Sequence, residues 1–206
     1  MEKVDVTEGV RELYTSCSQI AEVVAERAVF ICIACEGEPT DEAVSQTSQL
    51  LYAVVYKIRA QLKAIRQMDF KLAKLEFRWM SDPHSTPVEE WRWRLLLRVP
   101  DEVTQAELRS ARKVLLAERN LYASGVKRVC WREGRALQVM HTGPRGKTDK
   151  TCAMLRERAV ELGYRLKGTA HEVYISNPVK TAPERMKTLV RLPIAWPRPD
   201  YARRQA

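Results

Sequence analysis

The stretch His-Glu-Val-Tyr-Ile-Ser-Asn-Pro at residues 171–178 decides the fold class that we predict for this chain. Its residues alternate as in a β-strand, with Val173 and Ile175 on one face. Glu172 and Tyr174 share the other face. A buried carboxylate beside a buried phenol needs polar partners or a ligand. The strand is therefore expected to place one face of a sheet against a binding site.

An upstream stretch repeats this pattern. Leu-Leu-Arg-Val-Pro at residues 96–100 matches Leu-Val-Arg-Leu-Pro at residues 189–193, and Glu76 precedes the first copy as Glu172 precedes the second. In both copies the glutamate and the arginine are about twenty residues apart, as a duplicated supersecondary unit requires. Two such units indicate one groove shared between them.

Hydrophobic periodicity and turn residues predict an α+β fold. The expected helices cover residues 6–27, 40–62 and 104–119, and a further helix ends at Leu162 with Gly163 as its cap. The expected strands cover 28–35, 71–80, 90–99, 170–177 and 187–194, with a hairpin of 125–131 and 135–141 around Glu133-Gly134. These elements give one domain, 1–206, with a first β-α-β-β module at 28–100, a connecting helix at 101–124, a second module at 125–194 and a tail at 195–206.

The composition is that of a globular protein, with 206 residues, 45% hydrophobic and 30% charged. No apolar run approaches the roughly 20 residues that span a bilayer, and the N-terminus has no secretory pattern, so a cytoplasmic location without membrane contact is expected. The five cysteines are an odd number and predict no disulfide framework. Cys32 and Cys35 fall on opposite faces of a predicted strand, so neither a metal site nor a cofactor is expected.

The formal net charge of +9 permits binding to nucleic acid or to an acidic partner protein. Such binding through the basic surface is the alternative function. The basic residues are scattered, however, and do not interleave with exposed aromatic residues as single-strand binders require. This pattern disfavours nucleic acid as a partner.

Five segments together resemble the GyrI-like small-molecule-binding family, in particular its free-standing bacterial members. The segments cover most of the chain and are residues 75–79, 91–95, 141–144, 171–178 and 181–188. The resemblance implies two β-α-β-β modules of the SHS2 type, related by a pseudo-twofold axis around an aromatic groove with a central glutamate. It also implies a planar, hydrophobic and often cationic ligand. Certain members are similar to hydrolases that open the ring of cyclopropanoid DNA-alkylating compounds.

The resemblance implies that Glu172 and Tyr174 are the catalytic and ligand-binding pair. The other ligand-binding residues that it implies are Trp79, Trp91, Trp93 and Glu76. The chain departs from the family pattern at Phe77, Met80 and Arg145, where the family has glycine, tryptophan and often an aromatic residue, so an enzymatic activity is open. The expected partner is a planar hydrophobic or cationic small molecule, and the chain is expected to be a monomer or homodimer.

Each prediction has an alternative in ordinary packing. Glu172 is also consistent with a salt bridge to Arg191 on the neighbouring strand. Trp91 and Trp93 share a face with leucines, a pattern that is typical of a core stripe. The three histidines lack metal-ligand or triad spacing and are expected to be structural.

Overall fold

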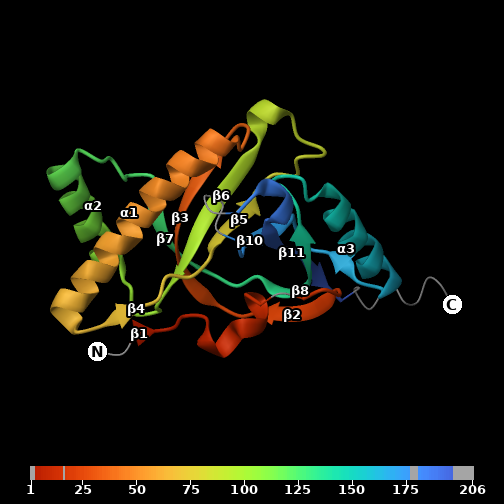
Figure 1. Ribbon diagram of the computed structural model, residues 1–206, viewed down its shortest axis with the longest axis horizontal. Helices are drawn as coiled ribbons and strands as arrows, with labels where there is room; N and C mark the ends of the chain where they lie inside the picture. The colour runs from red at the N-terminus through yellow and green to blue at the C-terminus, as the bar shows by residue number, and fades with distance from the viewer. Residues whose placement is uncertain (1–2, 16, 177–180, 197–206) are drawn as a thin grey trace. The chain divides into compact units, whose positions relative to one another are not determined.

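The computed structural model describes residues 3–15, 17–176 and 181–196, so residues 197–206 of the predicted tail lie outside the described part. The chain forms two compact units, unit 1 with residues 1–11 and 27–132 and unit 2 with residues 12–26 and 133–206. Both combine antiparallel strands with helices, which confirms the α+β class (Figure 1).

Unit 1 contains a four-stranded antiparallel sheet in the order β5-β6-β3-β7 and a parallel pair of short strands, β1 and β4. Helix α1 packs against β3, β6 and α2 (Figure 1). The elements are β1 (Lys3–Val4), β3 (Ala28–Glu36), α1 (Asp41–Arg66), β4 (Asp69–Phe70), β5 (Leu75–Trp79), η2 (Val88–Glu90), β6 (Arg92–Val99), α2 (Gln105–Arg119) and β7 (Val126–Trp131).

The helices of unit 1 begin where the sequence predicts them. Thr40 caps α1 by accepting a hydrogen bond from the Ala43 backbone N–H at 3.1 Å. Thr104 and Glu107 form a capping box at the start of α2. The buried stripe of α1 faces the sheet and α2, and includes Leu51, Val54 and Ile58, which are fully buried.

Unit 2 contains a four-stranded antiparallel sheet in the order β2-β8-β11-β10, with the short β9 paired to the end of β11. Helix α3 packs on β8 and β11. The elements are β2 (Ala21–Ala25), β8 (Gly134–Thr142), α3 (Asp149–Glu161), β9 (Arg165–Leu166), β10 (His171–Tyr174), η3 (Pro183–Arg185) and β11 (Lys187–Ala195). The 3-10 helix η1 (Glu8–Leu13) precedes β2. Gly163 follows α3 with a φ of 73°, which confirms its predicted role as the cap.

Two predictions of local structure are wrong. The predicted helix at 6–27 is η1 followed by β2, in which buried Val23 and Ala25 alternate with exposed neighbours. The predicted hairpin of residues 125–141 does not form, because β7 pairs with β3 while β8 pairs with β2 and β11. In both cases the structure of the segment depends on a strand partner far away in the sequence, and a local sequence pattern carries no information about such partners.

The core strands of the two units have the same internal order. In unit 1 the chain runs β3-α1-β5-β6 and the strands lie in the order β5-β6-β3. In unit 2 it runs β8-α3-β10-β11 and the strands lie in the order β10-β11-β8. Each unit therefore contains a β-α-β-β arrangement with one further strand beside its first strand. None of the helices in the described part of the chain combines the length and the apolar content that a membrane crossing requires.

Candidate functional site

Glu172 and Tyr174 lie side by side on one face of β10, as the alternation predicts. Their cross-strand neighbours on β11 are Val190 and Thr188. Only 3% of Glu172 and 5% of Tyr174 is exposed. An exposed salt-bridged strand, the alternative for this pair, is therefore excluded, and both polar groups need partners inside unit 2.

The first partner of Glu172 comes from the start of α3. The Thr148 hydroxyl donates a hydrogen bond to Glu172 Oε1 at 2.7 Å. Thr148 occupies the N-cap position of α3, but its side chain makes no capping hydrogen bond, so its hydroxyl is available to the carboxylate. This contact places Glu172 on the α3 side of the sheet. No sequence pattern indicates this contact, because a threonine just before a helix is typical of an ordinary N-cap.

The second partner is Tyr174, which joins Glu172 to Arg145. The phenol donates to the Glu172 carboxylate and accepts a hydrogen bond from the Arg145 guanidinium. The chain Arg145–Tyr174–Glu172–Thr148, which we call the Glu172 network, connects the loop before α3 with β10. A hydrogen-bonded carboxylate and phenol in contact can hold and transfer a proton between them.

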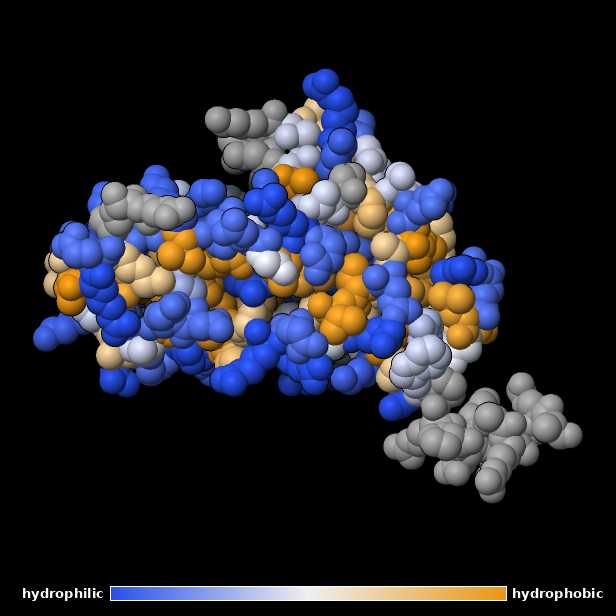
Figure 2. Space-filling view, turned by 90° about the horizontal axis from the view of Figure 1, so that it is seen from below, coloured by the Kyte–Doolittle hydropathy of each residue, from blue (hydrophilic) through white to orange (hydrophobic). Residues whose placement is uncertain are grey.

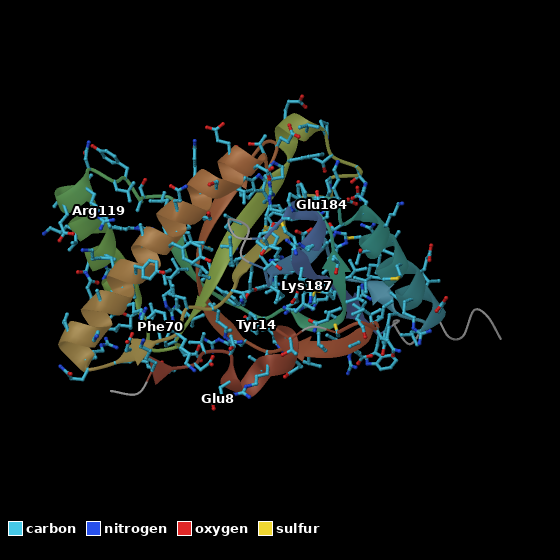
Figure 3. All side chains as sticks on the ribbon, viewed as in Figure 1. Glu8, Tyr14, Phe70, Arg119, Glu184 and Lys187 are labelled. Atoms are coloured by element: carbon cyan, nitrogen blue, oxygen red, sulfur yellow. The ribbon has the colours of Figure 1, made fainter. Side chains whose placement is uncertain are left out.

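A tight turn holds Arg145 in place. The Lys147 N–H donates to the Pro144 carbonyl at 3.2 Å, and Gly146 has a φ of 75°, as the third residue of a type II turn requires. The Gly143 N–H donates to the Met186 carbonyl at 2.9 Å, which ties the turn to the start of β11. In Figure 3, the labelled Glu184 and Lys187 mark the segment around Met186.

Burial raises the pKa of Glu172, against the hydrogen bonds from Thr148 and Tyr174 and the charge of Arg145, which oppose the rise. Burial also raises the pKa of Tyr174 well above its usual value, and the Glu172 charge adds to this rise. The phenol therefore keeps its proton at neutral pH. Glu172 is a carboxyl group whose basicity is increased by its surroundings, which suits a general base.

The opposite face of β10 carries a second buried network. His171, Arg191 and Gln138 are neighbours across β10, β11 and β8. Glu133 contacts two of them, His171 Nδ1 at 3.0 Å and Arg191 Nη1 at 3.1 Å. We call these four residues the Glu133 network. Arg191 is therefore the partner of Glu133, and the predicted salt bridge between Arg191 and Glu172 is wrong because the two side chains lie on opposite faces of the sheet.

The Glu133 network also fixes the segment before β2. Gln138 Nε2 donates to the Glu12 carbonyl at 2.7 Å, and Arg191 donates to the Leu13 carbonyl. Burial raises the pKa of Glu133, but the charges of His171 and Arg191 and their hydrogen bonds outweigh it and hold the pKa at about 2. Sequence patterns did not indicate this network, because Glu133 was expected to lie in a hairpin turn.

In unit 1 the predicted tryptophans form an aromatic cluster with Phe77. Trp93 stacks on Phe77 with ring centroids 5.5 Å apart, and Trp79 contacts Phe77 and Trp91 edge to face at 5.2 and 5.3 Å. Trp93 is 1% exposed, and its indole N–H donates to the Gly37 carbonyl at 3.1 Å. Trp79 and Trp91 are half-buried. A ligand-binding role for any of the three stays a prediction.

Glu76 lies on the other face of β5 from this cluster. Its cross-strand neighbour is Leu96, whereas Trp79 pairs with Trp93. The aromatic face is the one that α1 covers, because Cys35, the cross-strand neighbour of Trp93, contacts Thr47 of α1. Glu76 therefore lies on the sheet face opposite α1, whereas Glu172 contacts Thr148 at the start of α3. A ligand contact for Glu76 also stays a prediction.

The remaining candidates have packing environments. All five cysteines are free, and the described residues contain no group of three or more His, Cys, Asp and Glu side chains suited to a metal ion. Cys32 and Cys35 lie on opposite faces of β3. His141 Nδ1 contacts the Thr151 hydroxyl at 2.9 Å, and His84 is exposed.

Comparison with known proteins gives a family and a set of similar structures. The profile of the GyrI-like small molecule binding domain matches residues 29–195. A crystal structure of a hydrolase from Listeria innocua is 29% identical, with a TM-score of 0.80 over 94% of this chain and 100% of that one. A second Listeria innocua hydrolase structure is 28% identical, with a TM-score of 0.82 and the same coverage.

One more distant structure shares the fold alone. The EcmrR C-terminal domain is 12% identical, with a TM-score of 0.61 over 87% of this chain and 98% of that one. A comparison with curated proteins gives no match.

Proposed function

The chain belongs to the GyrI-like small molecule binding domain family, whose profile matches residues 29–195, and from this premise we propose that it binds a planar, hydrophobic small molecule against Glu172 and Tyr174 and hydrolyses a strained ring in it. The observation that carries the proposal is the Glu172 network. It joins a carboxylate of raised pKa to a phenol that keeps its proton. The similar structures described as hydrolases support the catalytic part.

The substrate class that we propose is the cyclopropanoids, in which a cyclopropane is conjugated to a dienone. Glu172 accepts a proton from a water molecule whose oxygen attacks the ring CH₂ group. The C–C bond of the ring breaks, and its electron pair moves through the dienone to the carbonyl oxygen, which becomes a phenolate. The phenolate then takes up a proton, so that the net reaction adds one water. A positioned general base of this kind contributes roughly 10²–10⁴-fold in rate.

Tyr174 serves as a hydrogen-bond donor in this proposal, because its raised pKa keeps the phenol neutral. Thr148 holds the carboxylate in one orientation. In unit 1, Trp79 and Trp91 are half-buried while Trp93 is fully enclosed, and a ligand contact for any of them stays a prediction from the sequence.

The test is to incubate the purified protein with a cyclopropanoid alkylator and to follow the hydrate by mass spectrometry. Glu172→Gln should lose the activity, and Glu184→Gln, which changes an exposed carboxylate in η3, should keep it. If the wild type is no faster than Glu172→Gln while both bind the compound, the protein is a binder without turnover. If neither binds it, the whole proposal fails.

We also propose that the two β-α-β-β arrangements descend from one duplicated module. Their identical strand order and the repeated Leu-Val-Arg-Leu-Pro pattern support this origin. The module limits 28–100 and 125–194, a cytoplasmic location and a monomeric or homodimeric state remain predictions from the sequence.

A further inference from the structure

Strand β10 is too short for its apolar residues to determine its register. It has four residues, all of them buried, and Val173 is the one aliphatic residue among them. Within unit 2 it pairs with β11, so that Glu172 opposes Val190. A shift of one residue would exchange the two faces of the strand. Glu172 would then leave the α3 face and lie on the reverse face, where the Glu133 network is found.

The end of β10 does not fix the register either. The backbone N–H groups of Ile175 and Ser176 both donate to the Lys187 carbonyl, at 3.0 and 3.1 Å. Two residues on one strand thus oppose a single residue on the other, which is the arrangement of a β-bulge. A bulge accommodates one extra residue in a strand, so this end of β10 is compatible with more than one register.

The Glu133 network supplies directional contacts at the first residue of β10. Both carboxylate oxygens of Glu133 contact His171 Nδ1, at 3.0 and 3.1 Å. Arg191 opposes His171 on β11 and donates to Glu133 through Nη1 at 3.1 Å. Its other two nitrogens donate to Gln138 at 2.9 Å and to the Leu13 carbonyl. Hydrogen bonds depend on direction, whereas apolar packing does not, so these contacts select one register.

The stability of the sheet alone does not account for this network. The side chains of Glu133, Gln138, His171 and Arg191 are at most 5% exposed. A buried ion pair is often no more stable than apolar side chains of similar volume. The best-attested advantage of buried polar groups is that they specify a single register.

We infer that Glu133 is a positioning residue: by fixing the register of β10 from the reverse face, it places the Glu172 carboxylate at Thr148. Glu133 acts through His171 and Arg191 and not by contact with the reacting atoms. The inference rests on the proposed function, because it concerns the base of that reaction, but the position of Glu172 is measurable without turnover.

The experiment compares the wild type with two variants of Glu133. Glu133→Gln removes the charge, and Glu133→Asp keeps the charge but shortens the side chain by one methylene group. Leu108→Ala is the control for a general loss of stability, because Leu108 is a fully buried residue of α2 in unit 1. Circular dichroism establishes that each variant is folded, and urea denaturation ranks their stabilities. If Glu133→Gln does not fold, Glu133→Asp decides.

Nuclear Overhauser effects report the register directly. In the wild type, side-chain protons of Glu172 and Val190 should give a signal, because the Cβ atoms of directly opposed residues lie about 4.5–5.5 Å apart. The signal should be lost in Glu133→Gln and weakened in Glu133→Asp, and Leu108→Ala should keep it. With a cyclopropanoid as substrate, kcat of Glu133→Gln should fall about 100-fold, as it does when a catalytic group is displaced, while KM changes little.

Three results would overturn the inference. The first is a folded Glu133 variant with the wild-type signal between Glu172 and Val190. The second is an equal loss of that signal in Leu108→Ala. The third is a variant that loses the signal and keeps the wild-type kcat. If the wild type hydrolyses no cyclopropanoid, the proposed function fails, and the signal still decides whether Glu133 sets the register.

Discussion

At the scale of single residues, Glu172 shows a conflict between stability and function. Its carboxyl group is buried, and burial raises its pKa, so ionising it at neutral pH costs free energy in the folded state. The folded protein therefore binds a proton more tightly than the unfolded chain. The contribution of Glu172 to stability is greatest when the group is protonated and declines as the pH rises from the ordinary value of 4.5 through the raised pKa of the folded state.

Glu172→Gln should abolish hydrolysis and raise the free energy of unfolding by about 1 kcal/mol at neutral pH, as commonly occurs when a strained functional group is removed. The gain should shrink as the pH falls and disappear below the ordinary value of 4.5, where the wild-type carboxyl group becomes protonated in both states. Urea denaturation of both proteins across this range measures the difference. A variant that is less stable than the wild type at neutral pH would contradict the assigned environment of Glu172.

Thr148→Val should raise the pKa of Glu172 further, because the change removes a hydrogen bond that favours the ionised form and leaves the side-chain volume nearly unchanged. Carbon NMR titration of the labelled carboxyl group measures this pKa directly. Thr151→Val is the matched control on the same helix, since Thr151 contacts His141. Equal titration curves for wild type and Thr148→Val would show that the hydroxyl does not act on Glu172.

At the scale of elements, β10 separates two buried networks whose carboxyl groups have pKa values shifted in opposite directions. The Glu172 network lies on the α3 face and contains a carboxyl group of raised pKa. The Glu133 network lies on the other face, crosses three strands and contains a carboxyl group whose pKa is held at about 2. Strand alternation alone explains why the adjacent residues His171 and Glu172 belong to different networks.

The Glu133 network should make the protein acid-sensitive. Because the pKa of Glu133 lies below its ordinary value of 4.5, its contribution is fully present above pH 4.5 and is lost as the pH falls toward 2. This contribution is on the order of 3 kcal/mol. Glu133→Gln should lower the free energy of unfolding by about 3–5 kcal/mol at neutral pH, since it leaves Arg191 and His171 without their carboxylate.

Chemical denaturation at a series of pH values tests this prediction. Between pH 4.5 and 2, the decline in stability should be smaller in Glu133→Gln than in the wild type. Glu161→Gln is the control, because Glu161 is exposed and pairs only at the surface. Parallel pH curves for wild type and Glu133→Gln would rule out the assigned role.

The turn before α3 is the element that positions Arg145. Gly146→Ala should cost about 1 kcal/mol from backbone strain alone, because a Cβ at this residue meets no atom within 4 Å but its φ is 75°. Gly168→Ala is the matched control, with open space and no positive φ. Thermal melts measure this cost, and an unchanged melting temperature would show that the positive φ at residue 146 carries no strain for alanine.

At the scale of the whole molecule, the excess of 35 Lys and Arg over 26 Asp and Glu raises the alternative of binding through the basic surface. Figure 2 shows hydrophilic side chains spread over the visible face with hydrophobic side chains between them. Several of the basic groups are already paired, such as Lys57 with Glu118 at 2.6 Å and Arg59 with Asp69 at 2.5 Å. Such pairing reduces the charge available to phosphates.

We therefore expect duplex DNA to show no mobility shift at about 150 mM salt, where nonspecific phosphate contacts are weak. Binding of a cyclopropanoid should change little with salt, because it depends on a buried network and not on counterion release. Parallel titrations at low and physiological salt compare the two. DNA binding that persists at physiological salt with a steep salt dependence would favour the alternative function.

The sequence by itself determined the α+β class, the starts of α1 and α2, the glycine cap of α3 and the two faces of β10. These features depend on contacts between residues close in the chain, such as Thr40 with Ala43 and Thr104 with Glu107. Local propensity, capping and alternation are sufficient to predict them.

Only the tertiary structure decided how the strands pair and which charges meet. Residues 21–25 form a strand because they pair with β8, and β7 pairs with β3 instead of with β8. Arg191 forms its ion pair with Glu133 and not with Glu172. The tertiary structure also brought Thr148 and Arg145 to Glu172 and Tyr174. Thr148 and Glu172 lie 24 residues apart and Glu133 and Arg191 lie 58 apart, and a local sequence pattern does not encode contacts over such separations.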